Sequence, residues 1–256
     1  MTEVFYGLDH VLLLDDYSDP KKHKHLAKHL LISLSGEINC LIEDKNILCK
    51  GIIIGSNVFH TIKSNGNDIL VYLFDETTDI AKEIEEKYLK NNFYHTLELD
   101  TIEEIKRFWN ENMRDREDIK KAKKNYSITY KKILKACNLN KNKFYIKDIR
   151  IKKVLKLLKD REEITDTIID DLAKSVFLSK SRLSHLFKEE TNISLNSFIV
   201  ITKIVKTYDY MLEGKNITDA SIKAGFYSPS HFATTNKNMF GISANEIRKD
   251  IRVIEI

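Results

Sequence analysis

The C-terminal part of the chain contains the same short pattern twice: a helix, a tight turn and a second helix. The first copy spans residues 171–188 and the second spans residues 220–237, and the two align after a one-residue insertion at Tyr227. In each copy a serine, Ser179 or Ser228, is placed to accept backbone N–H groups at the start of the second helix. The sequence therefore predicts two helix-turn-helix motifs in tandem.

Each second helix is predicted to bury one apolar face and to leave a polar face outward. Leu183, Leu186 and Phe187 share the inner side of the first, and Phe232 marks the inner side of the second. The outer faces present small, hydroxyl and basic side chains, which suit base edges and phosphates in a DNA major groove. The residues expected to contact DNA are Lys180, Ser181, Arg182, Ser184, His185 and Lys188 in the first motif and Ser230, His231, Thr234 and Lys237 in the second.

Two interpretations of this polar surface differ in function. A pair of solvated helices in an all-α bundle would look similar, but two copies with matching polarity favour DNA binding. Phosphate contacts are expected mainly from Lys180, Arg182 and Lys188. Base edges are expected to be read by Ser181, Ser184, His185, Ser230 and Thr234.

Residues from about 146 to 256 resemble the DNA-binding domain of AraC/XylS-type transcriptional regulators. The resemblance rests on short matches in both motifs and beyond them: Leu172-Ala173, Ser179, Leu186-Phe187-Lys188, Ala224-Gly225-Phe226, Phe240-Gly241 and Glu246-Ile247-Arg248. Phe177 replaces the family's turn glycine, and Asn236 replaces a core phenylalanine. An unpaired polar group at this inner position would cost roughly 1 to 3 kcal/mol, so either Asn236 finds partners or the second motif packs loosely.

A single helix is predicted between the two motifs. Apolar side chains repeat at helical spacing over residues 194–212, and Gly214 is placed to end the helix. A rigid connection would hold the two reading helices about one turn of DNA apart, roughly 34 Å. Ser243 and Glu246 have the spacing of a capping box, which predicts one more helix.

The first seventy-odd residues consist of short apolar runs separated by Gly, Asn and Asp. Six runs predict strands: 10–14, 30–34, 37–42, 47–54, 58–62 and 69–74. Their regular spacing suggests a small β-barrel or a β-sandwich. The segment 23–25, the glycines Gly51 and Gly55, and His60 resemble the cupin-like sensor domain of many AraC-type regulators. The predicted fold class is α+β, with residues 1–76 as a cupin-like effector or sensor barrel.

The histidines His23, His25, His29 and His60 allow two interpretations. Imidazoles inside a barrel mouth suit a transition metal. A metal cupin also places a glutamate a few residues after its histidine pair; here none follows, and four lysines between residues 21 and 28 add charge that disfavours a divalent cation. We therefore expect no metal and no cofactor, and we assign His23, His25 and His60 to an effector pocket.

Residues 77–141 are predicted to form a helical region. Apolar side chains recur at helical spacing in residues 77–92 and 101–113. Family relatives dimerise through helices here, which implies such a role for Ile102, Ile105, Phe108 and Trp109; the same stripe can instead pack on the chain's own barrel. The polar segment 138–143 is the expected linker, so that residues 142–256 form the DNA-binding domain.

Three cysteines, Cys40, Cys49 and Cys137, lack CxxC spacing and predict neither a zinc site nor a disulfide framework. If Asp44-Lys45 is a two-residue hairpin turn, Cys40 and Cys49 lie directly opposite each other, which would allow a redox switch. Reduced thiols are the rule in the cytosol, so we expect free thiols.

Composition adds limits to these interpretations. The 256 residues, 42% of them hydrophobic, suffice for two domains, and the modest net charge of +4 means that base and shape readout must add to charge attraction. Apolar runs are too short to span a membrane and the first residues lack a signal peptide, so a cytoplasmic protein is expected.

Known catalytic patterns are missing: there is no nucleophile with a base at motif spacing, no phosphate-binding glycine loop and no HExxH. We expect a transcriptional regulator, not an enzyme, controlled by a small-molecule effector or by dimerisation. Its expected partners are double-stranded DNA, RNA polymerase if it activates, an effector and a second copy of itself, and no membrane. The alternative is a metal-dependent cupin enzyme or binding protein with a helical appendage.

Overall fold

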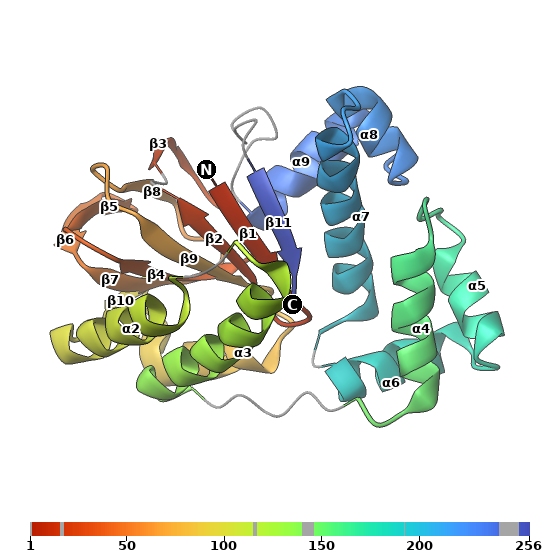
Figure 1. Cartoon of the computed structure of the whole chain (residues 1–256), viewed down its shortest axis with the longest axis horizontal. Coiled ribbons are helices and arrows are strands. Elements are labelled where there is room, and N and C mark those ends of the chain that lie inside the picture. Colours follow the sequence, from red (N-terminus) through yellow and green to blue (C-terminus); the bar gives the residue numbers. More distant parts are fainter. Residues whose placement is uncertain (1, 16–17, 115–116, 140–145, 192, 241–250) are drawn as a thin grey trace. The chain divides into compact units, whose positions relative to one another are not determined.

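The computed structural model describes residues 2–15, 18–114, 117–139, 146–191, 193–240 and 251–256 (Figure 1). The chain divides into two compact units, one made of residues 1–76, 80–142 and 238–256 and the other of residues 77–79 and 143–237. The first unit contains every described strand and the second is helical. The α+β class and its division into a sheet-rich N-terminal part and a helical C-terminal part are therefore confirmed.

The first unit is built on a seven-stranded sheet. In sheet order its strands are β10 (Tyr94–Thr96), β7 (Gly51–Ile54), β4 (Lys28–Ser33), β9 (Ile69–Phe74), β2 (Val11–Asp15), β1 (Thr2–Tyr6) and β11 (Ile251–Glu255). Neighbouring strands are antiparallel, except that β11 pairs with β1 in parallel. The end of the chain thus completes the N-terminal sheet, which the sequence did not predict.

A second sheet has four strands. Its order is β3 (Ser18–His23), β8 (His60–Lys63), β5 (Ile38–Ile42) and β6 (Lys45–Cys49). All six predicted strand runs overlap observed strands. Of the two architectures expected, a closed barrel is not found: the described strands form two separate sheets, and no pairing joins the edges β10 and β11 of one sheet to β3 and β6 of the other.

The β5–β6 hairpin also corrects the expected cysteine register. Ile42 pairs with Lys45, so the turn is made by Glu43 and Asp44 rather than by Asp44 and Lys45. Cys40 consequently lies opposite Ile47, and Cys49 lies opposite Ile38. The two thiols are diagonal neighbours, and all three cysteines are free in this structure.

Helices cover one face of the seven-stranded sheet (Figure 1). They are α1 (Asp79–Ile84), a π-helical turn η1 (Glu85–Leu89), α2 (Leu99–Asn112) and α3 (Ile119–Ala136). The helical region predicted in this part of the chain is therefore present. The highly charged residues 119–124 begin α3, and the side chain of Asp118 caps the start of this helix.

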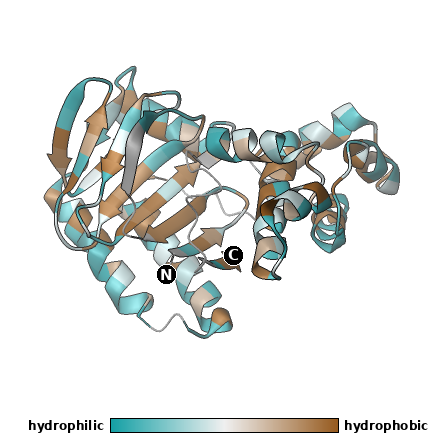
Figure 2. Cartoon of the chain, turned by 90° about the horizontal axis from the view of Figure 1, so that it is seen from above, coloured by the Kyte–Doolittle hydropathy of each residue, from teal (hydrophilic) through white to brown (hydrophobic). Residues whose placement is uncertain are grey.

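Strand alternation divides the interior of the first unit into two layers. Leu12 and Leu14 of β2 pack with the helices, whereas Val11 and Leu13 belong to a cluster shared with the four-stranded sheet. The strands therefore carry hydrophobic residues on both faces, and Figure 2 shows brown, hydrophobic segments along several of them. This pattern is typical of a central layer that is covered on both sides.

The second unit contains the helices of the two predicted motifs. They are α4 (Ile149–Asp160), α5 (Ile168–Ser175), α6 (Lys180–Thr191), α7 (Leu195–Leu212), α8 (Ile217–Lys223) and α9 (Pro229–Phe240). The predicted connecting helix is confirmed as α7: Ser194 caps its start and Gly214, with φ of +96°, follows its end. The capping box predicted at Ser243 and Glu246 lies outside the described residues. Among the described helices, none is both long and apolar enough to cross a membrane.

Candidate DNA-binding surface

The two helix-turn-helix motifs share one turn geometry. In the first, the N–H of Phe177 donates to Lys174 O at 3.2 Å and that of Leu178 donates to Ala173 O at 3.0 Å. In the second, the equivalent N–H groups of Gly225 and Phe226 donate to Ile222 O and Ser221 O, at 2.9 and 3.0 Å. Both turns therefore close the preceding helix with the same backbone pattern, as the sequence duplication predicted.

This shared turn requires a positive φ at its corner. Gly225 has φ of +97° and Phe177 has φ of +55°. Glycine reaches this region without strain, whereas a side chain costs roughly 1 to 2 kcal/mol there. The phenyl ring of Phe177 is 94% exposed, and Tyr227, the inserted residue of the second turn, is 89% exposed. In the sequence, Phe177 was identified as the replacement of a glycine and Tyr227 as an insertion. The high solvent exposure of both side chains was not predicted.

Serine caps open both reading helices, as predicted. Ser179 Oγ accepts the N–H of Arg182 at 3.2 Å, and Ser228 Oγ accepts that of His231 at 3.0 Å. Each hydroxyl satisfies an amide that otherwise has no partner within the helix. The start of both helices, α6 and α9, is thus fixed by the same interaction.

The burial of the α6 side chains confirms the predicted inner and outer faces of this helix. Leu183, Leu186 and Phe187 are buried. The outward set is exposed at Lys180, Ser181, Arg182 and His185 and half-buried at Ser184 and Lys188. Ser184 differs from the expectation in one respect, because its hydroxyl donates to Lys180 O at 2.9 Å and only its lone pairs remain for a base.

The second reading helix, α9, presents a similar but less basic surface. Phe232 is fully buried, whereas Ser230, His231, Thr234 and Lys237 are exposed. Phe226 contacts Phe232 at 5.2 Å between ring centroids and thereby packs the turn against the helix. The side chains of α9 assigned to DNA are therefore accessible.

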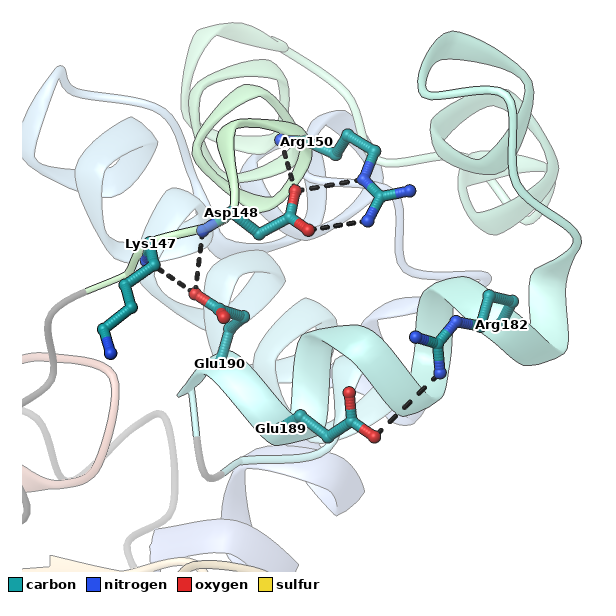
Figure 3. Close-up of polar contacts among 6 residues, drawn as sticks. All are labelled: Lys147, Asp148, Arg150, Arg182, Glu189 and Glu190. Carbon is teal, nitrogen blue, oxygen red and sulfur yellow. Dashed lines mark hydrogen bonds and ion pairs between the residues drawn. The ribbon is translucent and has the colours of Figure 1, made fainter.

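Acidic residues near α6 pair with some of its basic side chains. Lys180 Nζ lies 3.0 Å from Asp170 Oδ1, and Arg182 lies 4.0 Å from Glu189 Oε1 (Figure 3). All four side chains are largely exposed, and exposed ion pairs contribute only about 0 to 1 kcal/mol. A phosphate can therefore replace either carboxylate at little cost.

Glu190 has a structural role beside this surface (Figure 3). Its Oε2 accepts the N–H groups of Lys147 and Asp148, at 2.6 and 3.0 Å. Asp148 in turn caps α4 and pairs with Arg150, whose hydrogen bond lowers the pKa of the Asp148 carboxyl to about 2. The last turn of α6 is thus joined to the start of α4, which fixes the direction of the reading helix.

Asn236 finds a partner in the core. Its side chain is buried and its Oδ1 accepts the hydroxyl of Tyr208 at 3.0 Å. Tyr208 belongs to α7, and its ring also contacts Phe232. Of the two alternatives that the sequence left open, the structure shows the paired one.

Three of the four side chains assigned to dimerisation lie in the chain's own core. Ile102, Ile105 and Trp109 are at most 2% exposed and pack in the layer between helices and sheet. A Cβ on Gly51 would lie 2.9 Å from Ile102, so α2 packs closely on β7. The structure therefore shows the alternative use of this stripe, packing on the chain's own sheet. Phe108 is half-buried, with Lys132 Nζ 5.0 Å from its ring centre.

The histidines assigned to an effector pocket do lie together, but they are buried. His23, His25 and His60 are 6%, 3% and 1% exposed, and His29 joins them at 2%. Burial, followed by the neighbouring His60 and His23, lowers the pKa of His25 to about 2, so its imidazole is neutral at physiological pH. This cluster belongs to the first unit.

A family of known proteins matches this chain mainly in the helical unit. A family model described as a helix-turn-helix domain matches residues 172–250. The Msm operon regulatory protein of Streptococcus mutans is 34% identical over 86 residues, which are 33% of this chain and 31% of that protein. This chain thus spans about a third of the length of that relative. The predicted helix-turn-helix domain is confirmed, and the alternative of a cupin enzyme is not favoured.

Comparison with solved structures gave further matches. ToxT from Vibrio cholerae is 15% identical, with 93% of this chain and 96% of that chain covered and a TM-score of 0.46. A cupin protein from Bacteroides fragilis is 15% identical, with 26% of this chain and 66% of that chain covered and a TM-score of 0.24.

Proposed function

We propose that this chain, whose residues 172–250 match a helix-turn-helix family model, is a sequence-specific DNA-binding transcriptional regulator of the AraC type. The observation that supports the proposal most is the duplicated turn: two motifs with the same backbone hydrogen bonds each present a serine-capped helix with an accessible polar face. A helix of this kind can enter a major groove with its first turns toward the bases.

The first unit is proposed to sense a small molecule or to mediate dimerisation, and thereby to change how the second unit binds DNA. Double-stranded DNA is the main partner, and RNA polymerase is a further partner if the protein activates. Such a regulator acts in the cytoplasm and catalyses no reaction.

Selection of bound sequences from a random duplex pool tests the proposal directly. We expect enrichment of a site with two non-identical halves, because α6 and α9 present different side chains to the groove. If no sequence is enriched and binding depends only on salt concentration, the protein binds DNA without sequence specificity and the proposal is wrong.

His185→Ala is expected to change which sequences are bound rather than how tightly DNA is held overall. His185 is exposed on α6 and is the largest side chain in the set assigned to base edges. A lost base contact typically costs about 1 to 3 kcal/mol at one position of the site. The enriched sequences of the variant and wild-type proteins should therefore differ within one half-site only. Identical sequence profiles would show that His185 reads no base.

A further inference from the structure

Four imidazoles lie in the layer between the two sheets of the first unit. His29 on β4 shares its strand face with Leu31, and His60 on β8 shares its face with Ile62; both apolar residues belong to the cluster between the sheets. His23 on β3 pairs directly with His60 in the sheet register. The strands therefore direct the imidazoles of His23, His29 and His60 into the same interior layer, which is otherwise largely apolar, and the ring of His25, between β3 and β4, contacts all three.

The distances within this histidine cluster (His23, His25, His29 and His60) are close to those of a metal site. One ring nitrogen from each of His23, His25 and His60 lies within 4.8 Å of the others. The His29 ring is 4.5 Å from that of His25 and 4.7 Å from that of His60, between centroids. Four nitrogens around a tetrahedral zinc ion, each at about 2.0 Å, would be about 3.3 Å apart. For His23, His25 and His60, a contraction of about 1.5 Å at most, through side-chain torsions, would reach that spacing.

Within the part of the chain that the structure describes, His25 and His29 have buried ring nitrogens without hydrogen-bond partners, which is energetically costly. Neither ring nitrogen of His25 has a hydrogen-bond partner among the described residues, and His29 Nδ1 likewise has none. A neutral imidazole always carries one N–H, and leaving a buried donor unsatisfied costs about 1 to 3 kcal/mol. Apolar side chains would fill the same layer more cheaply, so the polarity of the cluster needs another explanation.

His60 is oriented in the way expected of a metal ligand. Its Nδ1 donates to the backbone O of Val58 at 2.8 Å, which places the proton on Nδ1 and the lone pair on Nε2. Metal-binding histidines commonly donate their second nitrogen to a backbone carbonyl or a carboxylate in this way. The hydrogen bond to Val58 O therefore fixes the orientation of the His60 ring and leaves the Nε2 lone pair available to a metal ion.

The nearby lysines are less of an obstacle than their number in the sequence suggests. Lys22 Nζ is 3.1 Å from Asp44, and Lys28 Nζ is 3.2 Å from Glu85. Lys24 is exposed to solvent. The charges of Lys22 and Lys28 are thus balanced by carboxylates, and the electrostatic argument against a cation loses most of its weight.

We propose that His23, His25, His29 and His60 together bind one divalent transition-metal ion. Neutral imidazoles suit Zn²⁺, Ni²⁺, Co²⁺ or Cu²⁺, whereas Mg²⁺ and Ca²⁺ prefer oxygen ligands. This reverses the expectation of no metal, which was based on a missing glutamate: His29 occupies the fourth position after His25 and supplies a nitrogen instead. The inference goes beyond the proposed function, because a metal site would exist whether or not the second unit binds DNA.

The test uses the full-length protein after removal of metals with a chelator. Zn²⁺ is titrated by calorimetry, and bound metal is counted by mass spectrometry after gel filtration. We expect one Zn²⁺ per chain, a rise in melting temperature with Zn²⁺ and none with Mg²⁺. His25→Gln/His60→Gln should weaken binding at least 100-fold, whereas His95→Gln, a histidine of β10 outside the cluster, should bind like wild type. Equal binding by the double variant, or no stoichiometric metal on wild-type protein, would overturn the site.

X-ray absorption of the zinc-loaded wild-type protein keeps the test independent of how the variants fold. The expected first shell contains at least three imidazole nitrogens. A shell dominated by sulfur or by carboxylate oxygen would place the metal elsewhere and reject the histidine cluster. Neither measurement involves DNA, so failure here leaves the proposed regulator intact, and absence of DNA binding leaves the metal site intact.

Discussion

Gly225→Ala is expected to destabilise the second unit by about 3 kcal/mol or more and to abolish ordered packing of the second helix-turn-helix motif. A Cβ at this position would lie 2.0 Å from the backbone O of Ile164 and 2.7 Å from its carbonyl carbon. Backbone atoms cannot rotate away as a flexible side chain can. The substitution also forces alanine into a φ of +97°. Denaturant unfolding followed by circular dichroism would measure the loss.

Gly214→Ala is the matched control for that prediction. Gly214 has nearly the same φ, +96°, but a Cβ there would meet no atom within 4 Å. Only the backbone cost of roughly 1 to 2 kcal/mol should therefore appear. The difference between the two variants isolates the collision with Ile164. Equal destabilisation of both proteins would mean that the turn between α8 and α9 does not pack on Ile164 as described.

Much of the helical unit could be predicted because its signals are local. Ser179, Ser228 and the spacing of apolar residues specify where each reading helix begins and which face is buried. Gly214 likewise marks the end of α7 from its own sequence context. The partner of Asn236 was not predictable, because Tyr208 is 28 positions away and meets it only after α7 and α9 pack.

The first unit was harder to predict because its organisation depends on pairing between distant segments. β11 pairs with β1 across almost the full length of the chain, and a short apolar run at the end of a helical domain does not indicate a parallel strand. β3 contains Pro20 and two lysines, which argue against a strand. A turn displaced by one residue was enough to move Cys40 away from the position opposite Cys49.

The histidines show the same limit for function. The sequence identified all four histidines as a group, but the metal was rejected because no glutamate follows the His23/His25 pair and because lysines surround it, and only His23, His25 and His60 were assigned to a pocket. Strand alternation and burial place the His29 side chain in the layer between the sheets, beside His60. Lysine charges that appear adjacent in sequence are balanced by Asp44 and Glu85 from other segments.

Arg182→Ala/Lys188→Ala is expected to weaken DNA binding on the order of 50- to 100-fold near 0.1 M salt, for all sequences alike. Each basic side chain that neutralises a phosphate releases about one counterion, so the slope of log affinity against log salt should fall by about two. Arg182 pairs only weakly with Glu189 in this structure, at 4.0 Å, and can turn to a phosphate. Fluorescence anisotropy over a salt series measures both quantities.

Lys131→Ala/Lys135→Ala is the control for charge, because it removes two exposed lysines of α3 in the first unit and changes the net charge equally. If attraction to DNA came only from overall charge, both double variants would lose affinity and slope to the same extent. If α6 contacts the backbone, the control should keep the wild-type slope. A control variant that loses as much slope as the α6 variant would remove α6 from the DNA-binding surface, even if the protein still binds DNA.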